Sequence, residues 1–153
     1  MKTEILMDHE PVADGGWLLR AMLKIEGTPR TDDGRVPLNL SIVLDRSGSM
    51  MGEKLAAAKE AARSLVQRLW PDDVVSVVTY DHEVQVVAAP ETGEHQADLT
   101  TRISGIEAGG STNLSDGWLK GREFVAAGQR AGEVNRVLLL TDGQANAGII
   151  DPE

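Results

Sequence analysis

The sequence predicts an α/β fold in which a mainly parallel β-sheet is flanked by helices. Two short apolar runs, Leu38–Leu44 and Arg136–Leu140, have the near-continuous hydrophobic character of strands that are buried on both faces. A third segment, Gly52–Trp70, carries apolar residues at three- and four-residue steps, which is the pattern of an amphipathic helix. Strand patterns that alternate with helical patterns predict parallel strands joined by helical crossovers.

The first 37 residues predict an additional β segment. Thr3–Met7 and Trp17–Ile25 are rich in apolar residues, and the Asp14–Gly16 region between them favours a turn, so we expect an antiparallel pair. Thr28–Pro37 is polar and contains proline and glycine, which predicts a linker. We therefore assign residues 1–37 to an N-terminal β hairpin and linker.

The helix predicted at Gly52–Trp70 has one apolar and one charged face. Its apolar stripe consists of Leu55, Ala58, Ala62, Leu65, Val66 and Leu69. The charged residues that lie off this stripe, and that we expect in solvent, are Lys54, Glu60, Arg63 and Arg68. Pro71 then closes the segment.

The remaining elements follow in order. Val74–Tyr80 is a strand by composition, and Glu83–Ala89 is a second one, with a tight hairpin at Asp81–His82 between them. The apolar spacing then predicts two further helices before the Arg136–Leu140 strand. Their marker residues are Leu99, Ile103 and Ile106 for the first, and Leu114, Trp118, Phe124 and Val125 for the second.

Oxygen-bearing side chains gather where the predicted core strands end. Asp45, Ser47 and Ser49 follow Leu38–Leu44 at alternate positions, and alternate residues of an extended segment point the same way. Asp142 follows the last core strand, and ligands of open α/β sheets collect at the carboxyl ends of strands. One carboxylate with neutral hydroxyls suits a hard divalent cation, above all Mg²⁺, with Mn²⁺ or Ca²⁺ as alternatives.

With a threonine in the glycine-rich loop 109–113, these residues form the pattern Asp-x-Ser-x-Ser, a distant Thr and a distant Asp. The sequence resembles in this respect the von Willebrand factor type A domain with its metal-ion-dependent adhesion site, from about residue 38 onward. The matching residues are Asp45, Ser47, Ser49, Thr112 and Asp142. The resemblance implies a sheet order 3-2-1-4 for the core strands, with the hairpin strand antiparallel at one edge. It also implies that an Asp or Glu of a protein partner completes the coordination of the metal.

The same residues partly fit three other kinds of site. Taken alone, Asp45 to Ser49 could be an ordinary capping turn, because Ser and Asp are frequent at strand-to-helix turns. An EF-hand loop starting at Asp45 needs Gly and Glu where Met50 and Ala56 stand. A nucleophile elbow needs glycines two residues either side of its Ser, and Ser49 has Ser47 and Met51 there.

Composition bounds the function further. The net charge of −9 opposes non-specific binding to nucleic acid. We see neither a membrane-length apolar stretch nor a signal peptide, so we expect no membrane span and a cytoplasmic location. There is no cysteine and therefore no disulfide or thiol chemistry.

These observations together predict a cation-dependent protein-binding module that is not an enzyme, since no general base stands at a sensible spacing. The alternatives are a metal-assisted hydrolase and a structural subunit with a purely stabilising metal. Asp151–Glu153 has the residues of a helix start, and the resemblance implies further strands and helices after it, so we expect residues 38–153 to be the N-terminal part of an A domain. The Arg136–Leu140 strand would then have an open edge, which predicts a homodimer joined along it.

Overall fold

The computed structural model describes residues 2–11, 17–26, 35–111 and 113–143, and only the backbone for the first two of these ranges. The chain divides into two compact units, Met1–Arg35 and Val36–Glu153. The first unit contains β1 (Lys2–Pro11) and β2 (Trp17–Glu26), which pair antiparallel. This confirms the predicted pair. Both strands are longer than predicted, because backbone pairing extends into polar residues such as Asp8 and Glu10.

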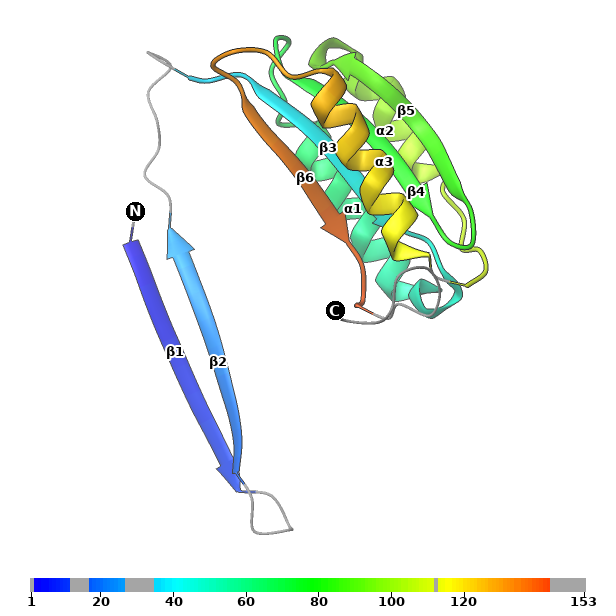
Figure 1. Cartoon of the computed structure of the whole chain (residues 1–153). Helices are drawn as coiled ribbons and strands as arrows, with labels where there is room; N and C mark the ends of the chain where they lie inside the picture. Colours follow the sequence, from blue (N-terminus) through cyan, green and yellow to red (C-terminus); the bar gives the residue numbers. More distant parts are fainter. Residues whose placement is uncertain (1, 12–16, 27–34, 112, 144–153) are drawn as a thin grey trace. The chain divides into compact units, whose positions relative to one another are not determined.

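The second unit is built on a four-stranded sheet with the order β5-β4-β3-β6 (Figure 1). Its strands are β3 (Leu38–Asp45), β4 (Val74–Tyr80), β5 (Val84–Thr92) and β6 (Val134–Leu140). β3 is parallel to both β4 and β6, whereas β5 is antiparallel to β4 at one edge. The predicted α/β class and the sheet order 3-2-1-4 are therefore confirmed.

Helices cover both faces of this sheet (Figure 1). The helical segments are η1 (Gly48–Met50), α1 (Glu53–Val66), η2 (Gly93–His95), α2 (Gln96–Ser104) and α3 (Leu114–Ala127). α1 and α2 pack on one face over a core that includes Ile42, Leu44 and Val77. α3 packs on the other face, where Phe124 lies against Val43 and its neighbours. Within the described ranges, no helix has both the length and the apolar character needed to cross a bilayer.

Two helix boundaries differ from the prediction because apolar periodicity continues past the helix ends. α1 ends at Val66 rather than at Trp70, yet Leu69, three residues beyond the end of the helix, is still buried in the core. In the same way Ile106 is buried just beyond the end of α2. The apolar periodicity of the sequence indicates which residues are buried. Because burial continues past the last helical residue, this periodicity places the helix ends too late.

α3 approaches the sheet closely through two buried glycines. A Cβ at Gly117 would lie 2.5 Å from Cδ1 of Tyr80, and a Cβ at Gly121 would overlap the Val43 side chain. Only glycine lets the helix backbone come so near. The approach brings the start of α3 to the edge of the sheet where the parallel strands β3, β4 and β6 end.

Candidate metal centre

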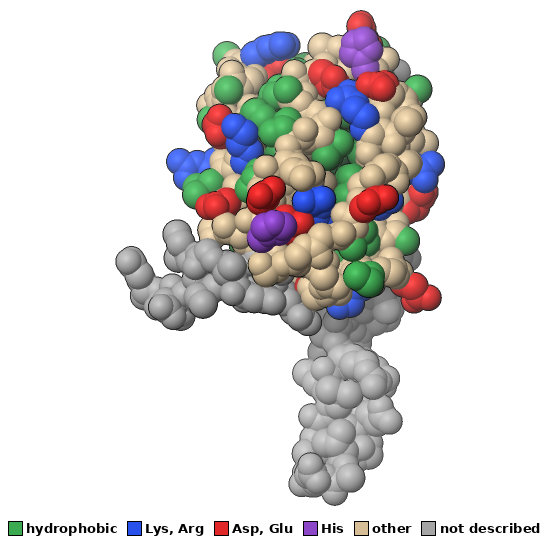
Figure 2. All heavy atoms as spheres, turned by 90° about the vertical axis from the view of Figure 1, so that its right-hand side faces the viewer, with side chains coloured by type: hydrophobic (Ala, Val, Ile, Leu, Met, Phe, Trp, Pro, Cys, Tyr) green, Lys and Arg blue, Asp and Glu red, His purple; other side chains and the backbone are tan. Residues whose placement is uncertain are grey.

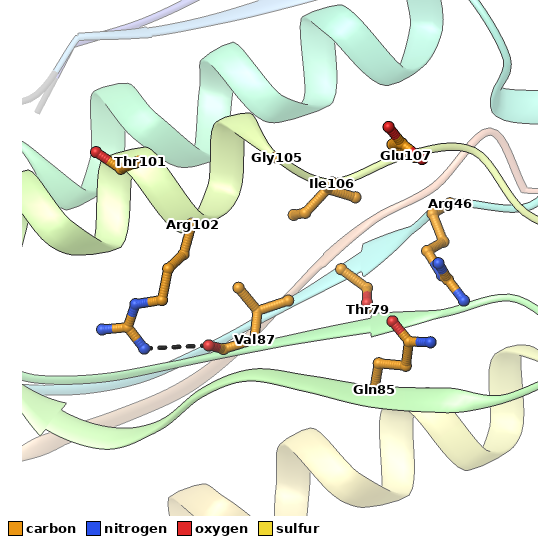
Figure 3. A pocket seen from close by; sticks show the side chains of 9 residues that line it. All are labelled: Arg46, Thr79, Gln85, Val87, Thr101, Arg102, Gly105, Ile106 and Glu107. Atoms are coloured by element: carbon orange, nitrogen blue, oxygen red, sulfur yellow. Dashed lines mark hydrogen bonds between the residues drawn. The ribbon is translucent and has the colours of Figure 1, made fainter.

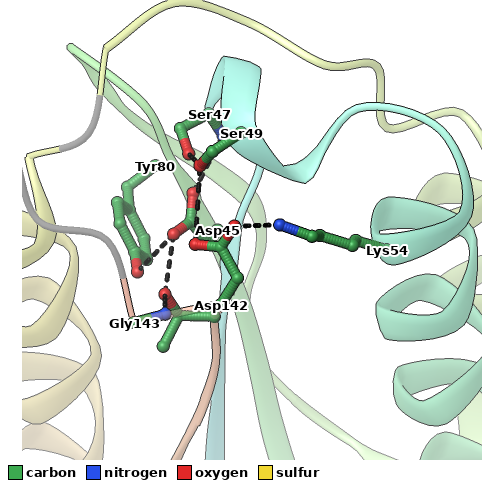
Figure 4. A network of polar contacts seen from close by, with 8 residues as sticks. Asp45, Ser47, Ser49, Lys54, Tyr80, Asp142 and Gly143 are labelled. Carbon is green, nitrogen blue, oxygen red and sulfur yellow. Dashed lines mark hydrogen bonds and ion pairs between the residues drawn. The ribbon is translucent and has the colours of Figure 1, made fainter. Parts of the chain in front are cut away.

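Four of the five predicted metal-binding residues meet at the carboxyl ends of β3 and β6 (Figure 4). Ser47 Oγ and Ser49 Oγ lie 3.1 Å apart, so the alternate hydroxyls do point the same way. Ser49 Oγ donates to Asp142 Oδ1 over 3.4 Å, which bridges 93 residues of sequence. Asp45 is the last residue of β3 and lies beneath the hydroxyls. Thr112 lies outside the described residues.

Asp45 is a fully buried carboxylate that is held by neutral donors. Its Oδ1 accepts the Ser47 backbone N–H at 2.9 Å. Its Oδ2 accepts the hydroxyls of Thr141 at 2.8 Å and Tyr80 at 3.2 Å. In the described part of the chain, no Lys or Arg forms an ion pair with it. Since burying a charge is costly unless an opposite charge compensates it, this carboxylate favours a cation nearby.

Tyr80 remains a hydrogen-bond donor in this setting. Burial raises the pKa of its phenol well above the usual value, and the carboxylates of Asp45 and Asp142 act in the same direction. The hydroxyl therefore keeps its proton and continues to orient Asp45.

Asp142 is the second carboxylate, and its side chain is 11% exposed. Its Oδ2 lies 2.7 Å from Nζ of Lys54, a residue of the first turn of α1 whose side chain is 53% exposed. The prediction that Lys54 belongs to a merely solvated face is therefore incomplete, because its ammonium group reaches over to a residue 88 positions away.

The loop on either side of position 112 is tied to the same sheet edge. Gly48 N–H donates to Gly110 O at 2.7 Å, and Gly109 N–H donates to Arg46 O at 2.7 Å. On the other side, Asn113 N–H donates to Asp81 O at 2.6 Å. Gly109 and Gly110 are thus bonded to the turn that carries Ser47 and Ser49, whereas Asn113 is bonded to Asp81 just after β4.

Asp81 is almost completely buried, and its side chain binds groups on both sides of this loop. It pairs with Arg46 at 2.9 Å and accepts the backbone N–H groups of Glu83 at 2.9 Å and Gly110 at 3.2 Å. Burial alone would raise the pKa of Asp81. The two N–H donors and the charges of Arg46 and His82 outweigh it, so this pKa lies below its usual range.

The donor set fits a small, hard cation. Ser49 Oγ lies 3.1 Å from Ser47 Oγ and 3.4 Å from Asp142 Oδ1, and both distances are near the roughly 3.0 Å that separates adjacent ligands around Mg²⁺. The described residues hold no group of three or more His, Asp or Glu placed to share a metal, so a metal at this site would also use other oxygens, such as the hydroxyls of Ser47 and Ser49. Ser47 precedes η1 without capping it through its side chain, which argues against an ordinary capping turn.

A separate cavity of about 390 Å³ lies between α2 and the sheet (Figure 3). Two guanidinium groups line it, but both are already engaged by the chain itself. Arg46 pairs with Asp81, while Arg102 pairs with Glu91 and Asp98 and also donates to the Val87 carbonyl. On the face shown in Figure 2, basic side chains likewise lie among acidic ones. Because carboxylates of the chain already pair with both guanidinium groups, we place the candidate site at the strand ends instead.

The sequence does not single out Tyr80, Thr141 or Lys54 as neighbours of the site. For the first two a signal exists, since each stands at the end of a core strand, the same criterion that selects Asp45. For Lys54 there is no local signal, because its contact depends on how α1 and β6 come together.

Comparison with known proteins gives the family context. A family model described as the von Willebrand factor type A domain matches residues 40–144. The protein sll0103 of Synechocystis sp. is 34% identical over 146 residues, which cover 94% of this chain and 34% of that protein. YfbK of Escherichia coli is 32% identical over 88% of this chain and 24% of its own length. The heavy chain H3 of human inter-alpha-trypsin inhibitor is 32% identical over 77% of this chain and 14% of its own length. This chain thus spans about a third or less of these relatives.

Solved structures agree on the fold. The von Willebrand factor domain of the pili tip protein Mfa5 from Porphyromonas gingivalis aligns with a TM-score of 0.63 and 24% identity, over 72% of this chain and 39% of that one. Proximal thread matrix protein 1 of the mussel byssus, which carries zinc in its adhesion-site motif, aligns with a TM-score of 0.64 and 21% identity. That alignment covers 74% of this chain and 33% of the mussel chain.

Proposed function

Because this chain belongs to the von Willebrand factor type A family, we propose that it is a divalent-cation-dependent protein-binding module. In this proposal Asp45, Ser47, Ser49, Thr112 and Asp142 hold a Mg²⁺ ion, and an Asp or Glu of a partner protein completes its coordination. The observation that carries the proposal is the fully buried Asp45, held by neutral donors directly beneath two hydroxyls and a second carboxylate.

The charge balance of the site supports binding of an external carboxylate. Two carboxylates and neutral hydroxyls leave a divalent cation only just neutralised, so the ion stays electrophilic. Mg²⁺ also tends to keep water ligands, and a carboxylate from outside can displace one of them. Ser49 is half-buried and Asp142 is 11% exposed, so the cluster opens to solvent on one side.

The choice of Mg²⁺ follows from ligand chemistry. Carboxylate and hydroxyl oxygens suit Mg²⁺, Mn²⁺ and Ca²⁺ better than they suit metals that prefer nitrogen or sulfur. The mussel protein carries zinc in the corresponding motif, so metal identity in this fold depends on more than the fold itself. We propose Mg²⁺ as the resident ion and Mn²⁺ as a substitute that is convenient in experiments.

We propose a binding role rather than a catalytic one. The groups that contact the cluster in the described part of the chain are hydroxyls, carboxylates and the Lys54 ammonium. The imidazole of His82 pairs with Asp81, and no contact between it and the cluster is found among the described residues. A hydrolase would need a group that takes a proton from metal-bound water.

The test is a selection from a random peptide library on the immobilised protein in Mg²⁺, followed by elution with EDTA. We expect the eluted peptides to be enriched in Asp or Glu and to lose binding when that residue is changed to Asn or Gln. The Asp45→Asn protein serves as the control surface and should retain none of them.

Two other results would point to the alternatives. Turnover of phosphate or ester substrates in Mg²⁺ would favour the hydrolase. A metal that raises the melting temperature while peptides bind equally well in EDTA would favour a purely stabilising ion.

A further inference from the structure

We infer that Lys54 is an internal competitor of the metal: its ammonium group neutralises Asp142 in the metal-free protein and must release it when a divalent cation binds. This inference rests on the proposed metal centre and adds to it a residue that sets how tightly the metal is held.

The geometry places the ammonium group on a proposed metal ligand. Lys54 Nζ lies 2.7 Å from Asp142 Oδ2, while Asp142 Oδ1 accepts the Ser49 hydroxyl (Figure 4). Both oxygens of the carboxylate are therefore engaged, one by another proposed ligand and one by a positive charge.

The position of Lys54 in α1 supports a long-range role. It is the second residue of the helix, where the helix dipole disfavours a positive charge and favours an acid such as the preceding Glu53. A lysine there gains nothing from its own helix, so the ion pair with Asp142 is the interaction that explains its orientation.

Electrostatics oppose simultaneous binding of both cations. A divalent ion held by Asp142 would lie within a few ångströms of the ammonium group, and like charges at that separation repel strongly in a partly buried site. The lysine is the cation that can leave, because its side chain is 53% exposed and needs only to rotate into water. The Arg46–Asp81 pair differs, since its partners are only 16% and 1% exposed and stay in place.

The experiment is a calorimetric titration of Mn²⁺ into the wild type and into Lys54→Met and Lys54→Arg. Lys120→Met is the matched control, because it removes the same charge from an ion pair with Glu123 on α3. We expect Lys54→Met to bind Mn²⁺ roughly two- to fivefold more tightly, which is the range an exposed ion pair contributes to an equilibrium constant. Lys54→Arg and Lys120→Met should stay near the wild type.

Thermal unfolding gives a second readout that a merely structural lysine would not produce. In EDTA, Lys54→Met should melt below the wild type, because Asp142 has lost its counter-charge. In saturating Mn²⁺ the difference should disappear.

Three results would overturn the inference. If the wild type binds Mn²⁺ and Lys54→Met binds it equally or more weakly, the competition is wrong while the metal centre stands. If the melting temperatures of Lys54→Met and the wild type differ as much in saturating Mn²⁺ as in EDTA, the competition is likewise wrong while the metal centre stands. If neither protein binds Mn²⁺, the metal centre itself fails and the inference fails with it.

Discussion

Tyr80 donates its phenolic hydrogen to Asp45 Oδ2 at 3.2 Å, and both side chains are completely buried. The ring of the same tyrosine packs against Gly117 of α3, where an added Cβ would lie 2.5 Å from the ring. The fit of α3 on the sheet and the orientation of the central carboxylate therefore depend on one side chain.

Gly117→Ala should weaken both the fold and the metal centre. The added methyl group must displace Tyr80, and overpacking of this kind costs about 1–3 kcal/mol of unfolding free energy. This exceeds the gain of about 1 kcal/mol that alanine brings to a helix interior. Urea unfolding and Mn²⁺ titration measure the two effects.

Gly121→Ala is the matched control for that change. Its methyl group would overlap Val43 and meets no atom of Tyr80 among its nearest neighbours, so it should reduce stability while Mn²⁺ affinity in the folded protein stays close to wild type. Equal losses of Mn²⁺ affinity in both variants would contradict a specific link through Tyr80.

Asp81 should make the fold sensitive to acid. Its pKa is below the usual 3.8 in the folded protein, so its stabilising contribution is complete above that value and is lost as the pH falls through the folded pKa. Asp81→Asn should lower the unfolding free energy at neutral pH by about 1.5–3 kcal/mol, the worth of hydrogen bonds to a charged group.

The difference between the wild type and Asp81→Asn should be constant above about pH 5 and shrink below pH 3.8. Urea unfolding at a series of pH values measures it. A difference that does not change with pH would mean that Asp81 contributes no charge-dependent stability.

Thr112→Ala should weaken Mg²⁺ binding less than a change at Asp45, by about tenfold or less, because water can replace one neutral oxygen. Calorimetry measures this directly, and Ser111→Ala is a neighbouring control that we expect to bind like the wild type. A loss as large as that at Asp45 would give Thr112 a greater role than we propose.

Self-association through β6 remains a prediction. Among the described strands β6 pairs with β3 alone, and Leu138 on it is 36% exposed. The other edge of β6 is rich in leucine and pairs with none of the described strands, so we propose that it pairs with a second copy, and light scattering at micromolar concentration should detect a dimer. Leu138→Lys should shift it toward monomer. A wild-type monomer that binds no hydrophobic dye would contradict this prediction.

The sequence predicts the core of the fold because burial on both faces leaves a strong local pattern. The strand Val74–Tyr80 has the predicted bounds, and every residue in it is buried. Boundaries are less accurate where burial and geometry diverge, as at Leu69 and Ile106, which are buried beyond the ends of their helices.

At the site, the sequence predicts the residues that stand at the carboxyl ends of core strands. It does not predict the residues that reach the site only through tertiary packing. The predicted residues stand at or just after strand ends and come together: Asp45, Ser47, Ser49 and Asp142. Lys54 reaches Asp142 because α1 begins at the edge of the sheet where β6 ends, and no spacing within α1 indicates that contact.

The central claim is that Asp45 anchors a divalent cation, and calorimetric titration of Mg²⁺ into the wild type and Asp45→Asn tests it most directly. Asp98→Asn, which neutralises an exposed carboxylate on α2, is the control. We expect binding by the wild type and by Asp98→Asn, and a loss of roughly a hundredfold or more in Asp45→Asn. Equal Mg²⁺ affinity in Asp45→Asn and the wild type would contradict the account.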